Sequence, residues 1–173
     1  MTIRLYNNLS AKLISKVLEI NNCNKDTFLE VIYNSTKFWE IVSPAEEIKA
    51  DFISPNVLHT IIKDKIPVIN FTIEWDGELV FIDKGDEEGK GRLIEFNVRN
   101  NKDIKKLEGN LRIKQIGANR IKVGIFISIF ILNNDFLNLI GKNVAEFTLR
   151  TKITEILRNL EKYCKSNELK NLL

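Results

Sequence analysis

The chain has few of the residues that metal sites, histidine-based catalysis and disulfide frameworks require. Its 173 residues include one histidine, His59, and two cysteines, Cys23 and Cys164. The two cysteines lie far apart in the sequence without metal-ligand spacing, as is usual in a reducing compartment. We therefore expect a cytoplasmic protein without a disulfide bridge. Since a metal site or a triad would have to be built around His59 alone, we assign no metal, no cofactor and no catalytic residue.

The chain also lacks a long hydrophobic segment. Its longest nearly apolar run is nine residues, from Gly124 to Leu132, whereas a membrane-spanning helix needs about 20. The first residues, MTIRLYNNLSAKL, have neither the basic start nor the apolar run of a secretory signal. We expect no transmembrane segment and a mature chain that begins at or near Met1.

No block of one charge is present either. The 26 basic and 23 acidic residues are interleaved and give a net charge of +3. Nucleic-acid-binding domains usually concentrate basic charge on one face. The short cluster Lys102, Lys105 and Lys106, followed by Arg112 and Lys114, is typical of a solvated strand face. We predict that nucleic acid is not a partner.

The glycine-rich stretch Gly85 to Gly91 lacks the features of a phosphate-binding loop. It has no Gly-Lys-Ser/Thr ending, and it joins two expected strands instead of leading into a helix. Its three adjacent acidic residues do not have the spacing of a calcium loop. The stretch from Lys84 to Lys90 is predicted to be a flexible hairpin loop.

The chain does have the length of one domain. A chain of this size buries roughly two thirds of its unfolded surface, enough for a core without disulfides. We expect residues 1–173 to form a single domain, with no internal repeat and no Gly/Pro/Ser-rich linker. Pro44, Pro55 and Pro67 fall between candidate elements.

The N-terminal part is expected to begin with a strand and a helix. Thr2–Tyr6 is the strand candidate, and Ser10 can cap a helix that ends at Asn21 and Asn22. The apolar stripe of this helix would be Ile14, Val17 and Leu18.

A second helix is predicted before Pro44. Thr27 and Glu30 have the spacing of a capping box. The apolar face of this helix would be Phe28, Ile32, Trp39 and Val42.

From Glu46 to Leu132 the hydrophobic period is two, which predicts a run of strands. Their connections of two to seven residues leave no room for crossover helices, so the sheet should be antiparallel. Asp76-Gly77 is a turn or bulge signal, so Glu78–Asp83 is either a separate strand or the continuation of a bent one. The phase of Val57–Lys63 stays open. The alternating apolar positions are Ile48, Ala50 and Phe52; Ile69, Phe71, Ile73 and Trp75; Ile94, Phe96 and Val98; and Leu107, Gly109, Leu111 and Ile113.

The last third combines a strand apolar on both faces, Arg120–Leu132, with one long helix from about Asn134 to Ser166. Residues 117–119 turn the chain into this strand, whose unbroken apolar face would be Val123, Ile125, Ile127, Ile129 and Ile131. The helix stripe would be Leu137, Ile140, Val144, Phe147, Ile153, Ile156, Leu157, Leu160 and Tyr163. Around Thr148 and Thr151 the stripe becomes polar, which marks either a solvated pocket or a phase shift.

This order of elements resembles the helix-grip fold of the START-like and polyketide cyclase-like (SRPBCC) superfamily over nearly the whole chain. The glycines of the penultimate strands and Leu139-Ile140-Gly141-Lys142 look like the carbon monoxide dehydrogenase branch of that superfamily and its small members. Phe38-Trp39 and Pro44 come later than the Trp-plus-Pro stretch of most members, which leaves the alignment of residues 7–45 open. The resemblance implies an α+β fold, with a curved antiparallel sheet of about seven strands, two short N-terminal helices and one long C-terminal helix.

The same resemblance implies a hydrophobic cavity between sheet and helix, and binding or carriage of a hydrophobic small molecule or lipid there without catalysis. Residues 137–147 are expected over the pocket, and residues 153–163 are expected to anchor the helix. The ligand-binding residues expected on this basis are Phe71, Ile73, Trp75, Ile94, Phe96, Leu111, Ile125, Ile127, Ile129, Leu137, Ile140, Val144 and Phe147.

Two alternatives remain open. A cyclase- or hydrolase-type enzyme on the same fold would need an ionisable group turned inward, for which the candidates are Glu74, Glu95, Arg92 and His59. A protein-interaction module would instead use Phe126 and Phe130, which are expected together on the outer face of the last strand. Exposed aromatic patches of this kind mark partner surfaces, so a homodimer through Phe126 and Phe130 is possible.

Overall fold

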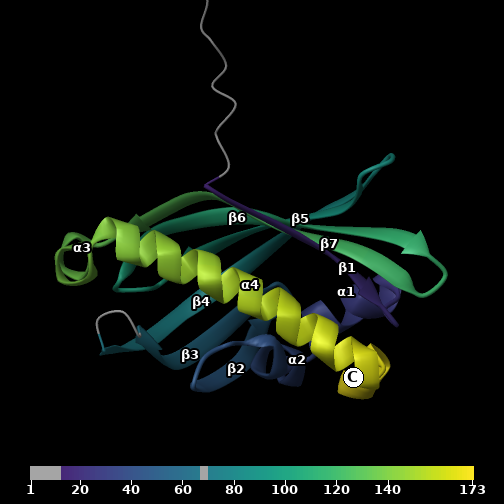
Figure 1. The fold of residues 1–173 in the computed structure, drawn as a ribbon, viewed down its shortest axis with the longest axis horizontal. Coiled ribbons are helices and arrows are strands. Elements are labelled where there is room, and N and C mark those ends of the chain that lie inside the picture. The colour runs from purple at the N-terminus through teal and green to yellow at the C-terminus, as the bar shows by residue number, and fades with distance from the viewer. Residues whose placement is uncertain (1–12, 67–69) are drawn as a thin grey trace, which may run out of the picture.

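A computed structural model of the chain describes residues 13–66 and 70–173. Within these ranges an antiparallel sheet wraps around a long helix (Figure 1). The strands are β1 (Ile14–Asn21), β2 (Glu47–Ser54), β3 (Val57–Ile66), β4 (Phe71–Glu87), β5 (Gly91–Arg99), β6 (Ile104–Gly117) and β7 (Arg120–Leu132). The helices are α1 (Lys25–Asn34), α2 (Thr36–Val42), α3 (Asn134–Ile140), α4 (Lys142–Ser166) and the short 3-10 helix η2 (Leu169–Leu172).

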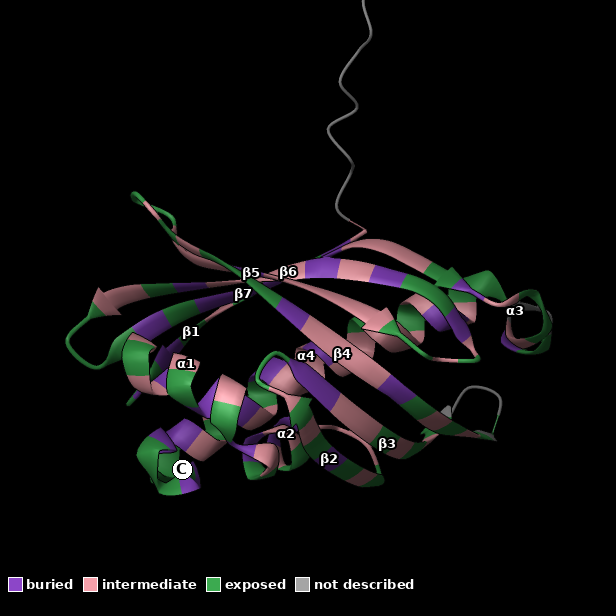
Figure 2. Ribbon diagram, turned by 180° about the vertical axis from the view of Figure 1, so that it is seen from behind, coloured by how far each residue is buried: buried purple, intermediate pink, exposed green. Residues whose placement is uncertain are grey.

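The strands described form one seven-stranded sheet in the order β1-β7-β6-β5-β4-β3-β2. Strands β2 to β7 follow one another as antiparallel neighbours, and β1 pairs with β7 at the opposite edge. The sheet is curved, and α4 runs across its hollow side with α1 and α2 near its C-terminal end (Figures 1 and 2). The core lies between this helical layer and the sheet. The α+β class expected from the sequence is confirmed.

The helix predicted from Ser10 to Asn22 is wrong where the structure describes it, because residues 14–21 are strand β1. This strand pairs with β7 from Ile14↔Ile127 to Asn21↔Arg120. Ile14 and Ile20 are fully buried, whereas Val17 is 48% exposed, so the burial follows a period of two. Hydrogen bonding to a neighbouring strand has outweighed a short helical stripe. Thr2–Tyr6 and Ser10 lie outside the described residues.

The helix predicted up to Pro44 is divided into α1 and α2. The Asn24 side chain caps α1 by accepting from the Asp26 and Thr27 backbone N–H groups. The Ser35 hydroxyl caps α2 by accepting from Phe38 N–H at 3.1 Å, and it donates to the Leu172 carbonyl at 2.6 Å. The two short N-terminal helices are therefore α1 and α2.

Strand β4 is one long strand, so Asp76-Gly77 is not a turn. Its register with β3 is unbroken from Ile66↔Phe71 to Val57↔Val80. The continuation alternative for residues 78–83 is therefore right, and the register shifts instead between Asp83 and Gly85. Because β4 extends to residue 87, the loop expected from 84 to 90 is reduced to a turn at residues 88–90. The pairing also fixes the open phase of β3, whose even-numbered residues 58 to 64 face the hollow side.

A bulge in β7 breaks the apolar face that the sequence predicted to be continuous. Ile127 pairs with Gly109 and Ile129 pairs with Glu108, so Ser128 is an extra residue on β7. The Ser128 hydroxyl donates to the Glu108 carbonyl at 3.1 Å. Beyond the bulge the inward positions change from odd to even numbers. Phe130 consequently points toward the helix, and Ile131 is 45% exposed.

The single helix predicted from Asn134 to Ser166 is interrupted at Gly141. This residue has φ of +77°, a left-handed conformation that glycine adopts readily, and it separates α3 from α4. Leu139-Ile140-Gly141-Lys142 is thus a break between two helices. Within the described ranges, no helix is long and apolar enough to cross a membrane.

The two cysteines lie together in the core although they are far apart in the sequence. Both thiols are free and buried, and their Sγ atoms are 3.7 Å apart. The hydrogen bond with Cys164, reinforced by burial, raises the pKa of the Cys23 thiol. This contact joins the C-terminal half of α4 to the segment that follows β1.

The bulge at Ser128 predicts unequal effects for two isoleucines that the sequence pattern treats as equivalent. Ile127→Ala should lower the free energy of unfolding by about 2–5 kcal/mol, because Ile127 is 1% exposed. Ile131→Ala, at a position 45% exposed, should cost less than about 1 kcal/mol. Urea unfolding of both variants measures the difference. Equal losses would show that β7 has no change of face.

Candidate functional site

An apolar cavity separates the sheet from α4. It has two adjoining chambers, chamber one of about 280 Å³ and chamber two of about 250 Å³. Chamber one lies toward α3, and chamber two lies over the middle of the sheet. Both chambers are lined by Ser43, Ile62, Trp75, Leu107, Leu149, Ile153 and Ile156. Because so many residues belong to both, the two chambers form one elongated site.

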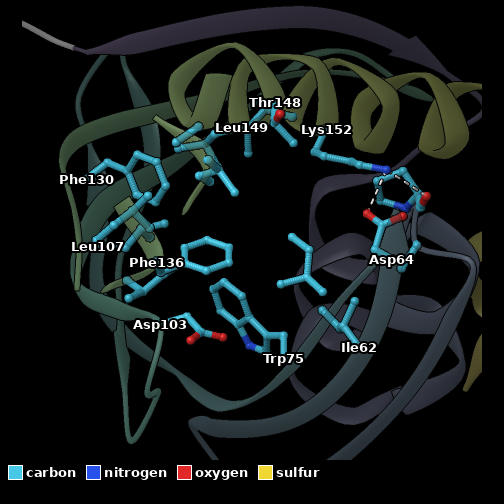
Figure 3. A pocket seen from close by; sticks show the side chains of 18 of the residues that line it. Ile62, Asp64, Trp75, Asp103, Leu107, Phe130, Phe136, Thr148, Leu149 and Lys152 are labelled. Atoms are coloured by element: carbon cyan, nitrogen blue, oxygen red, sulfur yellow. Dashed lines mark hydrogen bonds and ion pairs between the residues drawn. The ribbon is translucent and has the colours of Figure 1, made fainter. Parts of the chain in front are cut away.

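The roof of the cavity is the first half of α4. Its residues at the cavity follow the spacing of one helix face and are Ala145, Thr148, Leu149, Lys152, Ile153 and Ile156. Figure 3 shows Thr148, Leu149 and Lys152 projecting from this helix into the cavity. The polar interruption noted near Thr148 in the sequence therefore faces the pocket.

The structure brings seven of the predicted ligand-binding residues to the cavity. They are Ile73, Trp75, Phe96, Leu111, Ile125, Ile127 and Ile140. Four others do not line it: Ile94 is fully buried, Ile129 lies beyond the bulge, Val144 packs against the core, and Phe147 is 60% exposed. The side chains of Phe71 and Leu137 are not among those described. Whether any of these residues binds a ligand stays a prediction.

Sequence reasoning missed several cavity residues, and for different reasons. The alternation around Ile62 does not fix its phase, and Phe130 is predicted on the wrong face because the bulge has no sequence signal. Leu149 could have been found, since Ala145, Leu149 and Ile153 share one helix face at intervals of four residues. The predicted stripe, through Val144 and Phe147, is rotated away from the cavity. Phe136 on α3 was also missed.

The apolar wall of chamber one contains an ion pair. The Lys152 ammonium lies 2.8 Å from the Asp64 carboxylate and donates to the Pro44 carbonyl at 3.3 Å (Figure 3). The two side chains are 24% and 15% exposed. The pair therefore joins α4 to β3 and to the end of α2 at the cavity wall.

A second carboxylate, Asp103, lines chamber one below Trp75 (Figure 3). Its backbone N–H donates to the Asn101 side-chain oxygen at 2.9 Å, and its carbonyl accepts from the Asn133 N–H at 2.9 Å. These bonds fix the turn before β6 and therefore the position of the Asp103 side chain.

Chamber two has one carboxylate at its wall, that of Glu78 on β4. The Asn100 amide donates to it at 2.8 Å and the Arg99 guanidinium at 2.5 Å. These hydrogen bonds, that of Asn100 first, hold the pKa of Glu78 below its ordinary value. Glu78 is consequently a fixed negative charge near the inner end of the cavity.

The four ionisable residues proposed for an enzyme lie outside the cavity. His59 pairs with Asp76 at 2.6 Å, and Asp76 is 74% exposed. Glu74 is 76% exposed and Glu95 47% exposed, and each pairs with a lysine. Arg92 belongs to a cluster at the far end of β4. Within the described ranges, no three His, Cys, Asp or Glu side chains are placed to hold a metal ion.

The Arg92 cluster links α1 to the sheet. Arg92 lies 2.8 Å from Asp83 and 3.2 Å from Asp86, and Lys25 of α1 lies 2.9 Å from Asp86. Burial alone would raise the pKa of Asp83, but hydrogen bonds from Arg92 and from the Gly85 N–H leave it lowered. The hydrogen bond from Lys25 outweighs burial and, with that from Arg92, lowers the pKa of Asp86. The cluster therefore has a structural role.

The predicted dimer surface is wrong, because Phe126 and Phe130 do not share a face. Phe130 lines chamber one, whereas the Phe126 ring lies over Gly124 on the other side of β7. A Cβ added to Gly124 would lie 2.8 Å from that ring, which explains the small residue there. Dimerisation itself stays untested.

Comparison with known proteins finds likeness in structure and none in sequence. No family model matches the chain, and no curated protein matches it. The solved structures similar to it include the Zhui aromatase/cyclase from Streptomyces sp. R1128, at 11% identity and a TM-score of 0.62, covering 88% of this chain and 92% of that one.

Two further solved structures are similar over most of their length. A START superfamily protein from Mycobacterium smegmatis is 14% identical with a TM-score of 0.58, covering 88% of this chain and 97% of that one. A STAR-related lipid transfer protein from Xanthomonas axonopodis is 12% identical with a TM-score of 0.57, covering 91% and 90%. The chain thus has the helix-grip fold that START and polyketide cyclase proteins share.

The Arg92 cluster predicts a loss of stability in acid. Carboxyl groups whose pKa is lowered on folding stabilise the protein above their unfolded pKa, and this contribution is lost as the pH falls through the folded value. For Asp83 and Asp86 the loss should begin near the ordinary value of 3.8 and continue below it. Arg92→Met should reduce this acid dependence and lower stability at neutral pH by up to about 1 kcal/mol, since the pairs are partly exposed.

Urea unfolding across this pH range measures the effect. Lys84→Met, which removes the exposed pair with Glu95, is the matched control. If both variants have the same pH dependence as the wild type, the cluster does not supply the acid-sensitive stability.

Proposed function

We propose that the protein binds a hydrophobic small molecule or lipid between the sheet and α4, without catalysing a reaction on it. The observation that carries this proposal is the two-chambered cavity, whose walls consist almost entirely of isoleucine, leucine, valine and aromatic side chains. Burial of a ligand's apolar surface there is favourable by about 25 cal/mol per Å². The few polar groups at the wall would fix its orientation.

The fold supports this proposal without deciding it. START and lipid transfer proteins are among the similar structures, which makes hydrophobic ligand binding a natural use of the same cavity. The likeness to the carbon monoxide dehydrogenase branch stays a prediction from the sequence. A cytoplasmic location likewise rests on the sequence alone.

The enzyme alternative draws support from the aromatase/cyclase among the similar structures. Its chemistry on this chain would require an ionisable group that reaches the cavity. His59, Glu74, Glu95 and Arg92 all lie elsewhere. An interaction module without a ligand would have a cavity filled by side chains, and chambers of about 280 and 250 Å³ favour binding instead.

Filling the cavity should abolish binding. Leu149 lines both chambers, so Leu149→Trp should lower the affinity for the neutral apolar dye Nile red by at least about tenfold. The dye's fluorescence and the quenching of Trp75, which also lines both chambers, measure binding. Phe147→Trp is the matched control, because this position lies two residues away on α4 and is 60% exposed.

Both variants should unfold in urea as cooperatively as the wild type. If wild-type protein takes up no dye, or if Leu149→Trp and Phe147→Trp bind it equally, the cavity is not the binding site. Organic extraction of purified protein, followed by mass spectrometry, identifies any ligand that it carries.

A further inference from the structure

The charges at the cavity wall are unbalanced. Chamber one is lined by three charged residues, Lys152, Asp64 and Asp103, and chamber two adds Glu78. The lining in the described ranges therefore contains one cation and three carboxylates. Since Asp and Glu side chains carry a negative charge at neutral pH, the wall presents a net negative charge to any ligand.

The single cation is already neutralised. The Lys152 ammonium has three N–H donors, and it lies 2.8 Å from Asp64 and donates to the Pro44 carbonyl. The Glu155 carboxylate lies 3.8 Å away on its other side. A ligand carboxylate at this point would have to displace Asp64, leaving that side chain, 15% exposed, without its cation.

Asp103 is the carboxylate without a compensating charge. No described cationic side chain lies within ion-pair distance of it, and its backbone is held by Asn101 and Asn133. Its carboxylate faces the cavity beside Trp75, where it can accept a hydrogen bond (Figure 3). The wall of chamber one thus offers an acceptor that lacks a donor.

Glu78 has the same effect at the inner end. Its charge is fixed by the hydrogen bonds from Arg99 and Asn100, two residues that do not line the cavity. A negatively charged group would therefore meet a carboxylate in either chamber. Repulsion between like charges in a partly desolvated site disfavours such a ligand.

We propose that the ligand is an apolar molecule with a hydrogen-bond donor, a hydroxyl or an ammonium group, which Asp103 accepts in chamber one, and that the cavity discriminates against free carboxylic acids. This inference rests on the proposed function and makes its ligand class more specific. An alcohol or an amine can donate to Asp103 without disturbing the Lys152–Asp64 pair, whereas a fatty acid anion cannot.

Three probes with the same alkyl chain separate these classes. At about pH 8, decan-1-ol is neutral, decylamine is cationic and decanoate is anionic. Displacement of Nile red from the full chain should give a dissociation constant for decanoate at least about tenfold higher than that for decan-1-ol. Decylamine should bind at least as tightly as decan-1-ol.

Asp103→Asn tests the source of this preference. The asparagine has the same shape without the charge, so the ratio between decanoate and decan-1-ol should fall to within about threefold. Affinity for decylamine should decrease by about fivefold or more. Glu74→Gln is the matched control, because it removes one carboxylate from β4 at a position 76% exposed, and it should leave all three constants unchanged. Urea unfolding confirms that both variants are folded.

The outcomes separate this inference from the proposed function. If decanoate binds as tightly as decan-1-ol while Nile red still enters the wild type, the charge argument is overturned and the cavity function stands. If the preference exists but survives Asp103→Asn, Asp103 does not cause it, and the assignment is also overturned. If neither Nile red nor any of the probes binds, the proposed function itself fails.

Discussion

The cavity depends on how α4 is held, since the helix is anchored at one end and stands away from the sheet at the other. In its C-terminal half, Leu157, Leu160 and Cys164 are buried against the core. Each large side chain buried in this way contributes about 1.5–3 kcal/mol. In its N-terminal half the same face meets the cavity instead of a packed layer. One helix therefore supplies both the stability of the fold and the roof of the site.

Polar contacts set the height of the helix above the sheet. The Arg150 guanidinium donates to the Leu13 carbonyl at 3.0 Å, and the Asn159 amide donates to the Val42 carbonyl at 3.2 Å. Lys152 reaches across to Asp64 on β3. Partly exposed contacts of this kind are each worth at most about 1 kcal/mol, so their main effect is on position. They join α4 to the start of β1, to α2 and to β3 without filling the space between.

The sequence pattern was sufficient for the class of fold because strands β2 to β6 alternate clearly and α4 is long. It failed for residues 14–21, where four apolar positions fit a helix or a strand and only the pairing with β7 decides. It failed again at Ser128, since the residue that bulges has no distinctive side chain and yet reverses the face of Phe130. The stripe of α4 was missed by one position, because Val144 and Phe147 are as apolar as Ala145 and Leu149. Periodicity therefore predicted the layers, while the cavity wall depended on register.

The position of the Lys152–Asp64 pair is difficult to explain by stability alone. Replacing a largely buried ion pair by apolar residues of similar volume is often neutral or stabilising, by up to about 4 kcal/mol. The neighbouring wall positions are already apolar, so such residues would pack there without strain. The pair instead keeps a lysine ammonium occupied at the wall of chamber one, while Asp103 lacks a cation partner among the described residues. An arrangement that neutralises its only cation and leaves an acceptor available is better suited to selecting a ligand than to holding the fold together.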